Sequence, residues 1–471
     1  MVPVLMGLMF SCDKKDDPDP DPDPDKPNLS DEILVLNHWI WDGMNDVYLW
    51  EEHLPDMDPD YQEDPEDYFY NLLYSDDSYS WIVEDYDELI AQFSGVSLAT
   101  GMSVRPGLLT ETQVIGIVEY ITPNSPAEDS SISRGDIIMT IDGKPLTRDN
   151  YFDLYNQTTA TFGFAEWTGS QVLSNGESIT LTAIELNQNP IIHHEVIENQ
   201  GKKVGYFVYT QFTSGQNGEW RKELDNVLSS FIDAGVSDVV VDLRYNPGGS
   251  LDLSAHLASS LAPASAMNNE SVFVNLVWND GYNELWKQYD LDEDGKPDGG
   301  NSKQLVIKLA KSDVNLNLST VYFLTTDGTA SASESLMTGL YPYTNVVQIG
   351  ETSYGKCYGS ITIDDWQYDP KRHNWAMQPI VLKYANADGF TDFTAGISPD
   401  HEITDFLLEA KPFGSIDDPM LAKALSLIGG METKSTMSND PIYDDAFEAF
   451  PVEKNRMVER VISFSPATVV E

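Results

Sequence analysis

The sequence is poor in cysteine and in basic residues. Only two of its 471 residues are cysteines, and Cys12 lies so near the N-terminus that a disulfide framework is not expected. Lys and Arg number 27 against 77 Asp and Glu, which gives a net charge of −50. Nucleic acid and anionic lipid surfaces both attract clustered basic side chains, so this scarcity argues against either as a partner. Because 41% of the residues are hydrophobic and 11% aromatic, the chain can still build large cores.

The N-terminus combines an apolar run, Val2 to Phe10, with Ser11 and Cys12. This arrangement resembles the end of a bacterial lipoprotein signal, in which the cysteine becomes the lipidated first residue of the mature protein. A Pro-Asp alternation follows, which can form neither a helix nor a central strand and predicts an extended tether. The resemblance implies an extracytoplasmic protein, held to a bacterial membrane by a lipid on Cys12 alone, on the periplasmic face or at the cell surface. A cytoplasmic protein with an apolar N-terminus and an incidental cysteine is the alternative.

The patterns along the chain predict five segments. Residues 1–28 contain the signal and the tether, and residues 29–92 repeat apolar side chains at helical spacing, which predicts a small helical domain. Residues 93–187 are β-rich, and residues 188–430 alternate strands and helices. Residues 431–471 form a peripheral C-terminal tail.

The fourth segment is expected to be an α/β domain with parallel strands. Buried strands at 204–209 and 236–243 flank a helix from about Trp220 to Ala234, which is a βαβ unit. A second strand, helix and strand follow, with the helix beginning at Ser331.

The β-rich segment carries motifs in a recognisable order. A strand-like run at 114–118 leads to Pro126, which suits the first turn of a helix, and then to Asp142-Gly143, which suits a tight turn between strands. This order resembles the PDZ domain of bacterial proteases. PDZ domains add an extended peptide to a sheet edge and hold its terminal carboxylate on backbone N–H groups. The candidates for that substrate-binding loop are Gly101, Met102, Ser103 and Val104.

Three short segments of the α/β region carry the candidate chemistry. Residues 242–249 read Asp-Leu-Arg-Tyr-Asn-Pro-Gly-Gly, and paired glycines after a strand let the backbone approach a ligand closely. Residues 327–334 read Asp-Gly-Thr-Ala-Ser-Ala-Ser-Glu, and residues 350–356 read Gly-Glu-Thr-Ser-Tyr-Gly-Lys. Ser331 and Lys356 are 25 residues apart, which leaves room for a helix and a strand. Both side chains can therefore return to the same end of a sheet.

A serine and a lysine can together perform nucleophilic catalysis. The serine hydroxyl needs a base, and a lysine can serve if it is neutral. The usual lysine pKa of about 10.4 must then be lowered, and burial in an apolar pocket lowers it. Tyr354, Cys357 and Tyr358 fit such a pocket, and residues 352–360 contain no acidic side chain. A helix beginning at Ser331 would also direct unpaired N–H groups toward developing negative charge.

The three segments together resemble peptidase family S41, the C-terminal processing or tail-specific serine peptidases. The resemblance implies an α/β fold with an S41-type (ClpP/crotonase-like) catalytic core, beside the PDZ domain and the N-terminal helical domain. It implies that Ser331 attacks the scissile carbonyl and that Lys356 is the general base. The N–H groups of Gly248 and Ala332 would form the oxyanion hole, with Glu334 in support and no cofactor. The implied function is a serine endopeptidase that cleaves protein or peptide substrates near their C-termini, after the PDZ domain has bound the tail.

Each of these motifs has an alternative interpretation. Residues 331–334 also match a Ser-x-x-Glu capping box, and Lys356 could be an exposed loop lysine. Ser360 stands where the family commonly has a glutamine. The competing function is a catalytically inactive, PDZ-containing, peptide-binding lipoprotein. The competing mechanism is a triad that uses His256 or His373.

One acidic loop could bind a metal ion. Residues 290–298 place acidic side chains at positions 1, 3, 5 and 9, with glycine at 6, as in the front half of an EF-hand-like calcium loop. These side chains belong to Asp290, Asp292, Asp294 and Asp298. The twelfth position is Asn301 and not a bidentate glutamate. Because acidic turns are frequent in so acidic a chain, no metal site is expected, and this loop is the single candidate.

Overall fold

A computed structural model of the protein describes residues 26–291, 296–430 and 448–449. Cys12 and nearly all of the predicted tether lie outside these ranges, as do Asp292 and Asp294 of the acidic loop. No helix within the same ranges is long and apolar enough to cross a membrane.

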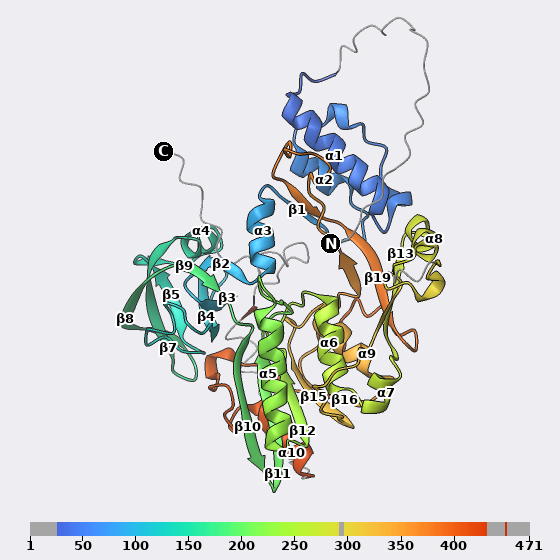
Figure 1. The fold of residues 1–471 in the computed structure, drawn as a ribbon. Helices are drawn as coiled ribbons and strands as arrows, with labels where there is room; N and C mark the ends of the chain where they lie inside the picture. Colours follow the sequence, from blue (N-terminus) through green and yellow to red (C-terminus); the bar gives the residue numbers. More distant parts are fainter. Residues whose placement is uncertain (1–25, 292–295, 431–447, 450–471) are drawn as a thin grey trace, which may run out of the picture.

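A six-stranded sheet forms the centre of the molecule (Figure 1). In spatial order its strands are β10 (Ile191–Asn199), β11 (Lys202–Tyr209), β12 (Asp238–Asp242), β15 (Thr320–Thr325), β16 (Asn345–Gly350) and β20 (His401–Glu402). All neighbours from β11 to β20 are parallel, and β10 runs antiparallel along one edge. The functional segments 242–249, 327–334 and 350–356 follow β12, β15 and β16, so they meet at one end of the sheet.

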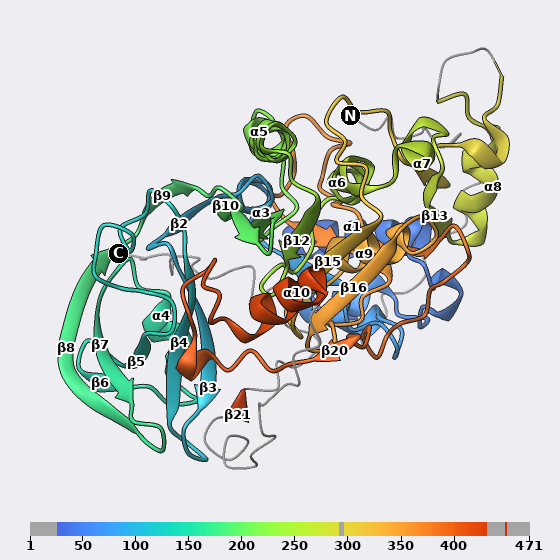
Figure 2. The same ribbon diagram turned by 90° about the horizontal axis from the view of Figure 1, so that it is seen from below.

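Helices cover both faces of this sheet (Figure 2). One face packs against α5 (Glu219–Ala234), α6 (Leu251–Leu261) and α9 (Ala332–Leu340), and the other packs against α10 (Pro419–Gly429). Burial on both faces explains the nearly continuous apolar runs of the central strands. Both predicted strand–helix–strand units are confirmed.

A second sheet, antiparallel throughout, lies on the left of Figure 1. Its strands are β21 (Glu448–Ala449), β3 (Met102–Leu108), β4 (Val114–Ile121), β5 (Ile137–Ile141), β7 (Thr159–Trp167) and β8 (Val172–Thr182), with β6 (Lys144–Pro145) beside β5. The tight turn predicted at Asp142-Gly143 is confirmed, and both residues have positive φ.

The helix predicted to begin at Pro126 is wrong. Residues 126–131 form turns, and the N–H of Ala127 donates to the carbonyl of Thr100. The hydroxyl of Ser130 donates to the Ala127 carbonyl and accepts from the N–H of Ile132. A short polar side chain therefore satisfies the backbone groups that a helix would have paired.

The N-terminal part of the described chain is helical, and its first two helices lie at the top of Figure 1. Its helices are α1 (Asp31–Val47), α2 (Pro65–Leu72) and α3 (Tyr86–Phe93). Ser30 caps α1 and Asp64 caps α2, because their side chains accept backbone N–H groups of the first turns. Strand β1 (Trp81–Val83) pairs antiparallel with β18 (Ala376–Gln378), which ties this part to the core.

A third, four-stranded sheet supports the functional end of the core. Its strands in spatial order are β14 (Val306–Lys308), β13 (Val272–Trp278), β19 (Ile380–Asn386) and β17 (Tyr358–Ser360). Strand β17 begins two residues after Lys356, and β19 lies beside it. The segment around Lys356 is therefore held between the central sheet and this smaller one.

Candidate active site

Ser331 occupies a strained turn between β15 and α9. Its φ of 55° and ψ of −112° differ from the extended conformation of an ordinary N-cap residue. A non-glycine residue held at such angles costs on the order of 1–3 kcal/mol. The hydroxyl faces the N–H of Glu334 as in a capping box, but no well-formed hydrogen bond joins them. The surrounding structure thus holds Ser331 in a conformation that sharp strand-to-helix turns use to present a nucleophile.

The carboxylate of Glu334 joins the serine segment to the lysine segment. Its Oε2 accepts the N–H groups of Ser331 and Lys356, each at 2.8 Å. Its Oε1 accepts the N–H of Gly355 at 2.7 Å and the hydroxyl of Ser353. The side chain is fully buried, and burial raises the pKa of Glu334 while the four donors oppose that rise. All four contacts are donors, so the site is built for the carboxylate anion.

Tyr384 of β19 makes a second connection between the same two segments. Its buried hydroxyl lies 2.9 Å from the carbonyl oxygen of Ser331 and 2.8 Å from that of Lys356. Burial raises the pKa of Tyr384 well above its usual value, so the phenol stays protonated and donates. Sequence reasoning missed this residue, because an isolated tyrosine in a strand belongs to no motif.

The Gly-Gly loop packs directly on the start of α9. Gly248 has a φ of 109°, and a Cβ there would lie 2.8 Å from the Cβ of Ser331 and 2.9 Å from the nitrogen of Ala332. The carbonyl of Asn246 accepts the N–H of Ala330 at 3.1 Å. Only glycine fits at 248, and Asn246 fixes the loop against the residue before the serine.

One of the two N–H groups expected in the oxyanion hole is open. Within the described part of the chain, the N–H of Ala332 makes no hydrogen bond. The N–H of Gly248 donates to Oδ1 of Asn246 at 2.9 Å. A developing oxyanion beside Ser331 can therefore accept a hydrogen bond from the Ala332 N–H directly. The Gly248 N–H can donate to it only after its hydrogen bond to Asn246 is broken.

Lys356 is half-buried beside aromatic and acidic side chains. Its Nζ lies 5.6 Å from the ring centroid of Tyr79. Burial lowers the pKa of Lys356 to about 8, and the carboxylates of Asp77 and Glu334 oppose the decrease. The direction agrees with the sequence-based expectation. Residues 352–360 contain no acidic side chain, but the folded chain brings one close to Lys356. This side chain is Asp77 of the N-terminal helical part.

The structure brings five predicted residues together and leaves the others elsewhere. Around one point lie Ser331, Lys356, Gly248, Ala332 and Glu334. The expected carboxylate loop is mostly strand: Met102, Ser103 and Val104 pair with β4, and only Gly101 precedes β3. Among the described hydrogen bonds, none joins these four residues to the cluster around Ser331.

The two candidate histidines have other neighbours. His256 is hydrogen bonded to Asp225 at 2.7 Å and to Arg221 at 3.1 Å. His373 packs against the ring of Trp39, with centroids 4.6 Å apart. Neither histidine has a described contact with the serine.

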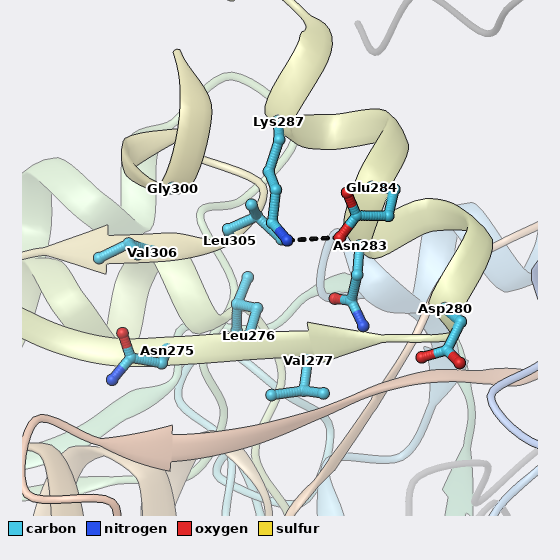
Figure 3. A pocket seen from close by; sticks show the side chains of 10 residues that line it. All are labelled: Asn275, Leu276, Val277, Asp280, Asn283, Glu284, Lys287, Gly300, Leu305 and Val306. Atoms are coloured by element: carbon cyan, nitrogen blue, oxygen red, sulfur yellow. Dashed lines mark hydrogen bonds and ion pairs between the residues drawn. The ribbon is translucent and has the colours of Figure 1, made fainter.

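A cavity of about 670 Å³ is lined by residues between Asn275 and Val306 (Figure 3). It opens between β13, β14 and α8 (Asp280–Gln288), where Lys287 donates to Glu284 at 2.6 Å. None of the residues that meet at Ser331 lines it. Asp298 of the acidic loop accepts the N–H of Leu291. In the ranges that the structure covers, no group of three or more His, Cys, Asp or Glu side chains could hold a metal ion.

Comparison with known proteins identifies the central region. Residues 203–403, which contain the whole cluster around Ser331, match the family model described as Peptidase family S41. The core is an S41 peptidase domain. Residues 36–81 match the Peptidase S41 N-terminal domain, so the helical part is also found in this family.

The S41 resemblance extends to curated relatives and to a solved structure. The carboxy-terminal processing protease CtpA of Bacillus subtilis is 26% identical over 287 residues, which are 60% of this chain and 53% of that protein. The carboxyl-terminal-processing protease of Synechocystis is 24% identical over 355 residues, 74% of this chain and 72% of the relative. A crystal structure of an S41 protease from Bacteroides fragilis superposes with a TM-score of 0.67 at 28% identity, covering 83% of this chain and 97% of the other. The chain spans about half the length of CtpA.

Proposed function

We propose that the protein is a serine endopeptidase that cleaves proteins or peptides near their C-termini, with Ser331 as nucleophile and Lys356 as general base. The observation that carries the proposal is the shared anchor of the two residues. The Glu334 carboxylate accepts the N–H of both at 2.8 Å, and the Tyr384 hydroxyl reaches the carbonyl of both. If Ser331 were only the N-cap of α9, nothing would require the Lys356 segment to be hydrogen bonded to the same two side chains.

The proposed reaction assigns one role to each of these groups. Neutral Lys356 takes the proton of Ser331 Oγ as that oxygen attacks the scissile carbonyl. The N–H of Ala332 stabilises the oxyanion, joined by that of Gly248 once it is released from Asn246. The tetrahedral intermediate then collapses, and protonated Lys356 gives its proton to the leaving amine. Water hydrolyses the remaining serine ester by the same base.

Substrate recognition is proposed to use the second sheet as a PDZ domain. The outer edge of β3 accepts an added strand, since β21 pairs there with Gly107 and Leu108 in antiparallel register. A substrate tail adding to this edge would run antiparallel to β3 and bring its terminal carboxylate toward Gly101 and Met102. The similarity to proteases named for carboxy-terminal processing supports a substrate that is cleaved near its C-terminus.

The proposed location is extracytoplasmic, with a lipid on Cys12 as the membrane anchor. The support is the apolar run before Cys12 and the Pro-Asp segment after it. Metabolic labelling with an alkyne fatty acid should mark the wild type and not Cys12→Ala. Equal labelling of both proteins would contradict a lipid anchor on Cys12.

The catalytic proposal is tested with a serine-reactive fluorophosphonate. We expect the folded wild type to be labelled, and Ser331→Ala and Lys356→Ala to lose labelling by at least about 100-fold, as for removal of a nucleophile or its base. Lys287→Ala is the matched control, because Lys287 pairs with Glu284 at the cavity that none of the residues around Ser331 lines. No labelling of the folded wild type between pH 6 and 10 would favour the inactive peptide-binding protein, and near-normal turnover of Lys356→Ala would favour a histidine triad.

The substrate class is tested in cells. Protein C-termini are compared by mass spectrometry between cells that express the wild type and cells that express Ser331→Ala. New C-termini that depend on Ser331 are the expected result. An active serine with internal cleavage sites only would refute processing at the C-terminus.

A further inference from the structure

The S41 domain does not build the surroundings of Lys356 alone. Tyr79 comes from the loop between α2 and β1, within the residues that match the S41 N-terminal domain. Its ring centroid lies 5.6 Å from Lys356 Nζ, and its hydroxyl donates to the carbonyl of Gly355 at 3.1 Å. One side chain thus contacts both the ammonium group of the lysine and the peptide that precedes it.

Tyr79 is itself held firmly in place. It is 7% exposed, and its N–H donates to Oδ1 of Asp77 at 2.8 Å. The other oxygen of Asp77 accepts the buried hydroxyl of Tyr48 at 2.7 Å. The Tyr79 ring also packs against Tyr354 and Tyr358 on either side of the lysine, with centroids 6.2 and 5.7 Å away. Asp77 of the N-terminal domain therefore holds the backbone of Tyr79, and the tyrosines on either side of the lysine hold its ring.

The loop that carries Tyr79 is joined to the core through the backbone. The hydroxyl of Ser80 accepts the N–H of Ile380 at 2.8 Å, and the N–H of Leu49 donates to the Ile380 carbonyl at 2.9 Å. Ile380 begins β19, the strand that carries Tyr384. The contact between Tyr79 and Lys356 is thus fixed at the same strand that holds the two catalytic segments together.

We propose that Tyr79 is a positioning residue for Lys356: its ring keeps water from Nζ, and its hydroxyl fixes the Gly355–Lys356 peptide. The N-terminal domain then completes the base site of the S41 domain. This inference rests on the proposed function, in which Lys356 is the general base.

The ring has two opposing effects on the lysine. Its face attracts the ammonium ion by about 0.5–2 kcal/mol, which favours the charged form, while the water that it excludes would have stabilised that form. Burial is the larger influence on Lys356, because its pKa falls to about 8 although Asp77 and Glu334 face it. The other titratable groups near Nζ are neutral below pH 8, since burial raises the pKa of each: Tyr79, Cys357 and Tyr358. Removing the ring should therefore raise the pKa of Lys356.

The experiment measures the lysine directly, apart from catalysis. Protein with 13Cε-labelled lysine is titrated by NMR in the Ser331→Ala background, and Lys356→Met assigns the signal. We expect a midpoint near pH 8 that moves up by about one pH unit or more in Tyr79→Ala, toward the free-lysine value. Tyr79→Phe keeps the ring and loses only the hydrogen bond to Gly355, so the Lys356 midpoint should not change. With Ser331 present, the same substitution should make fluorophosphonate labelling several-fold slower.

Ile82→Ala controls for general loosening of the N-terminal domain. Ile82 is 5% exposed, lies three residues after Tyr79 and pairs with Met377 and not with the lysine segment. It should lower the melting temperature and leave the Lys356 midpoint in place. An unchanged midpoint in Tyr79→Ala, or an equal shift in Ile82→Ala, would overturn the role of Tyr79. Failure of the proposed function is distinct, because it would appear as absent fluorophosphonate labelling whatever the titration shows.

Discussion

Glu334 shows how much of the site depends on one side chain. Two oxygens accept four hydrogen bonds, three of them from backbone N–H groups in two segments. An amide in the same place would keep one acceptor oxygen and set an NH2 group against donors. Buried donors without a partner cost about 1–3 kcal/mol each.

We therefore expect Glu334→Gln to lower the free energy of unfolding by about 2–4 kcal/mol and to abolish fluorophosphonate labelling. Denaturant unfolding and labelling of the same sample provide the measurement. Glu402→Gln, an exposed substitution of the same kind, should change neither. Retained labelling in Glu334→Gln would show that the anchor is dispensable.

The pKa of Lys356 predicts a pH dependence for activity. The base must be neutral, so below pH 8 the rate of fluorophosphonate labelling should rise about tenfold per pH unit and then level off. A rate that is flat between pH 6 and 9 would contradict a lysine base.

The same shift predicts that stability also rises with pH, but in a higher pH window. The folded-state pKa lies below the usual 10.5, so the unfolded chain binds more protons between pH 8 and 10.5, and stability gains from this group as pH rises through that window. Below pH 8 the buried charge carries its full cost, and Lys356→Met should then stabilise the inactive protein by up to about 3 kcal/mol. The difference in the free energy of unfolding between variant and wild type, measured by denaturant unfolding, should disappear near pH 10.5.

The residues of the candidate active site differ in how well the sequence predicts them. Ser331, Glu334 and Lys356 belong to short motifs in one region, so local sequence identifies them. Tyr79 and Tyr384 meet these residues only through folding, and no spacing or neighbouring residue distinguishes them from tyrosines of an ordinary core.

At the scale of elements, the loop after β12 and the start of α9 act as one unit. Gly248 lies where an added Cβ would meet the Cβ of Ser331 at 2.8 Å, the carbonyl of Ala330 at 2.9 Å and the nitrogen of Ala332 at 2.9 Å. Its φ of 109° is also unfavourable for any other residue.

Gly248→Ala should therefore displace the nucleophile and reduce fluorophosphonate labelling by at least about 100-fold, equivalent to about 3 kcal/mol. The matched control is Gly300→Ala, because a Cβ there would meet no atom within 4 Å. Full labelling of Gly248→Ala would mean that this loop can move away from the serine without loss.

The elements themselves were predicted best where hydrophobic patterns are long. The strand–helix–strand units around α5 and α9 follow from continuous apolar runs and a 3.6-residue period. The helix expected at Pro126 is replaced by turns, in which the hydroxyls of Ser125 and Ser130 accept the N–H groups of Glu128 and Ile132. The register of β1 on β18 joins residues almost 300 positions apart, which no local pattern encodes.

At the scale of the whole molecule, Arg134 docks the second sheet on the S41 core. Its guanidinium pairs with Asp405 at 3.0 Å, donates to the hydroxyl of Tyr245 and lies 4.7 Å from the ring centroid of Phe413. Burial opposes ionisation of Asp405, yet Arg134 and Arg244 together hold its pKa below the usual value. Tyr245 belongs to the loop that leads to Gly248, so the docking contact lies next to the candidate active site.

Arg134→Met should lower the free energy of unfolding by about 2–3 kcal/mol, because Asp405 then loses one of the two buried guanidinium groups with which it forms ion pairs. Hydrogen exchange should increase at residues 405–413 in this variant. Lys144→Met, on an exposed strand of the same sheet, should leave exchange there unchanged. Unchanged exchange in Arg134→Met would show that apolar contacts alone hold the two parts together.

The pairing of β1 with β18 bears on how this chain can be divided. A recombinant S41 domain that starts after Val83 would expose the free edge of β18, leave Met377 without Ile82 and uncover the lysine that Tyr79 shields. Unpaired edges promote association between molecules. The domain boundary that sequence comparison suggests is therefore not a boundary of autonomous folding. The helical part has to be produced together with the core, and a shortened protein that aggregates or is inactive says nothing about the chemistry of Ser331.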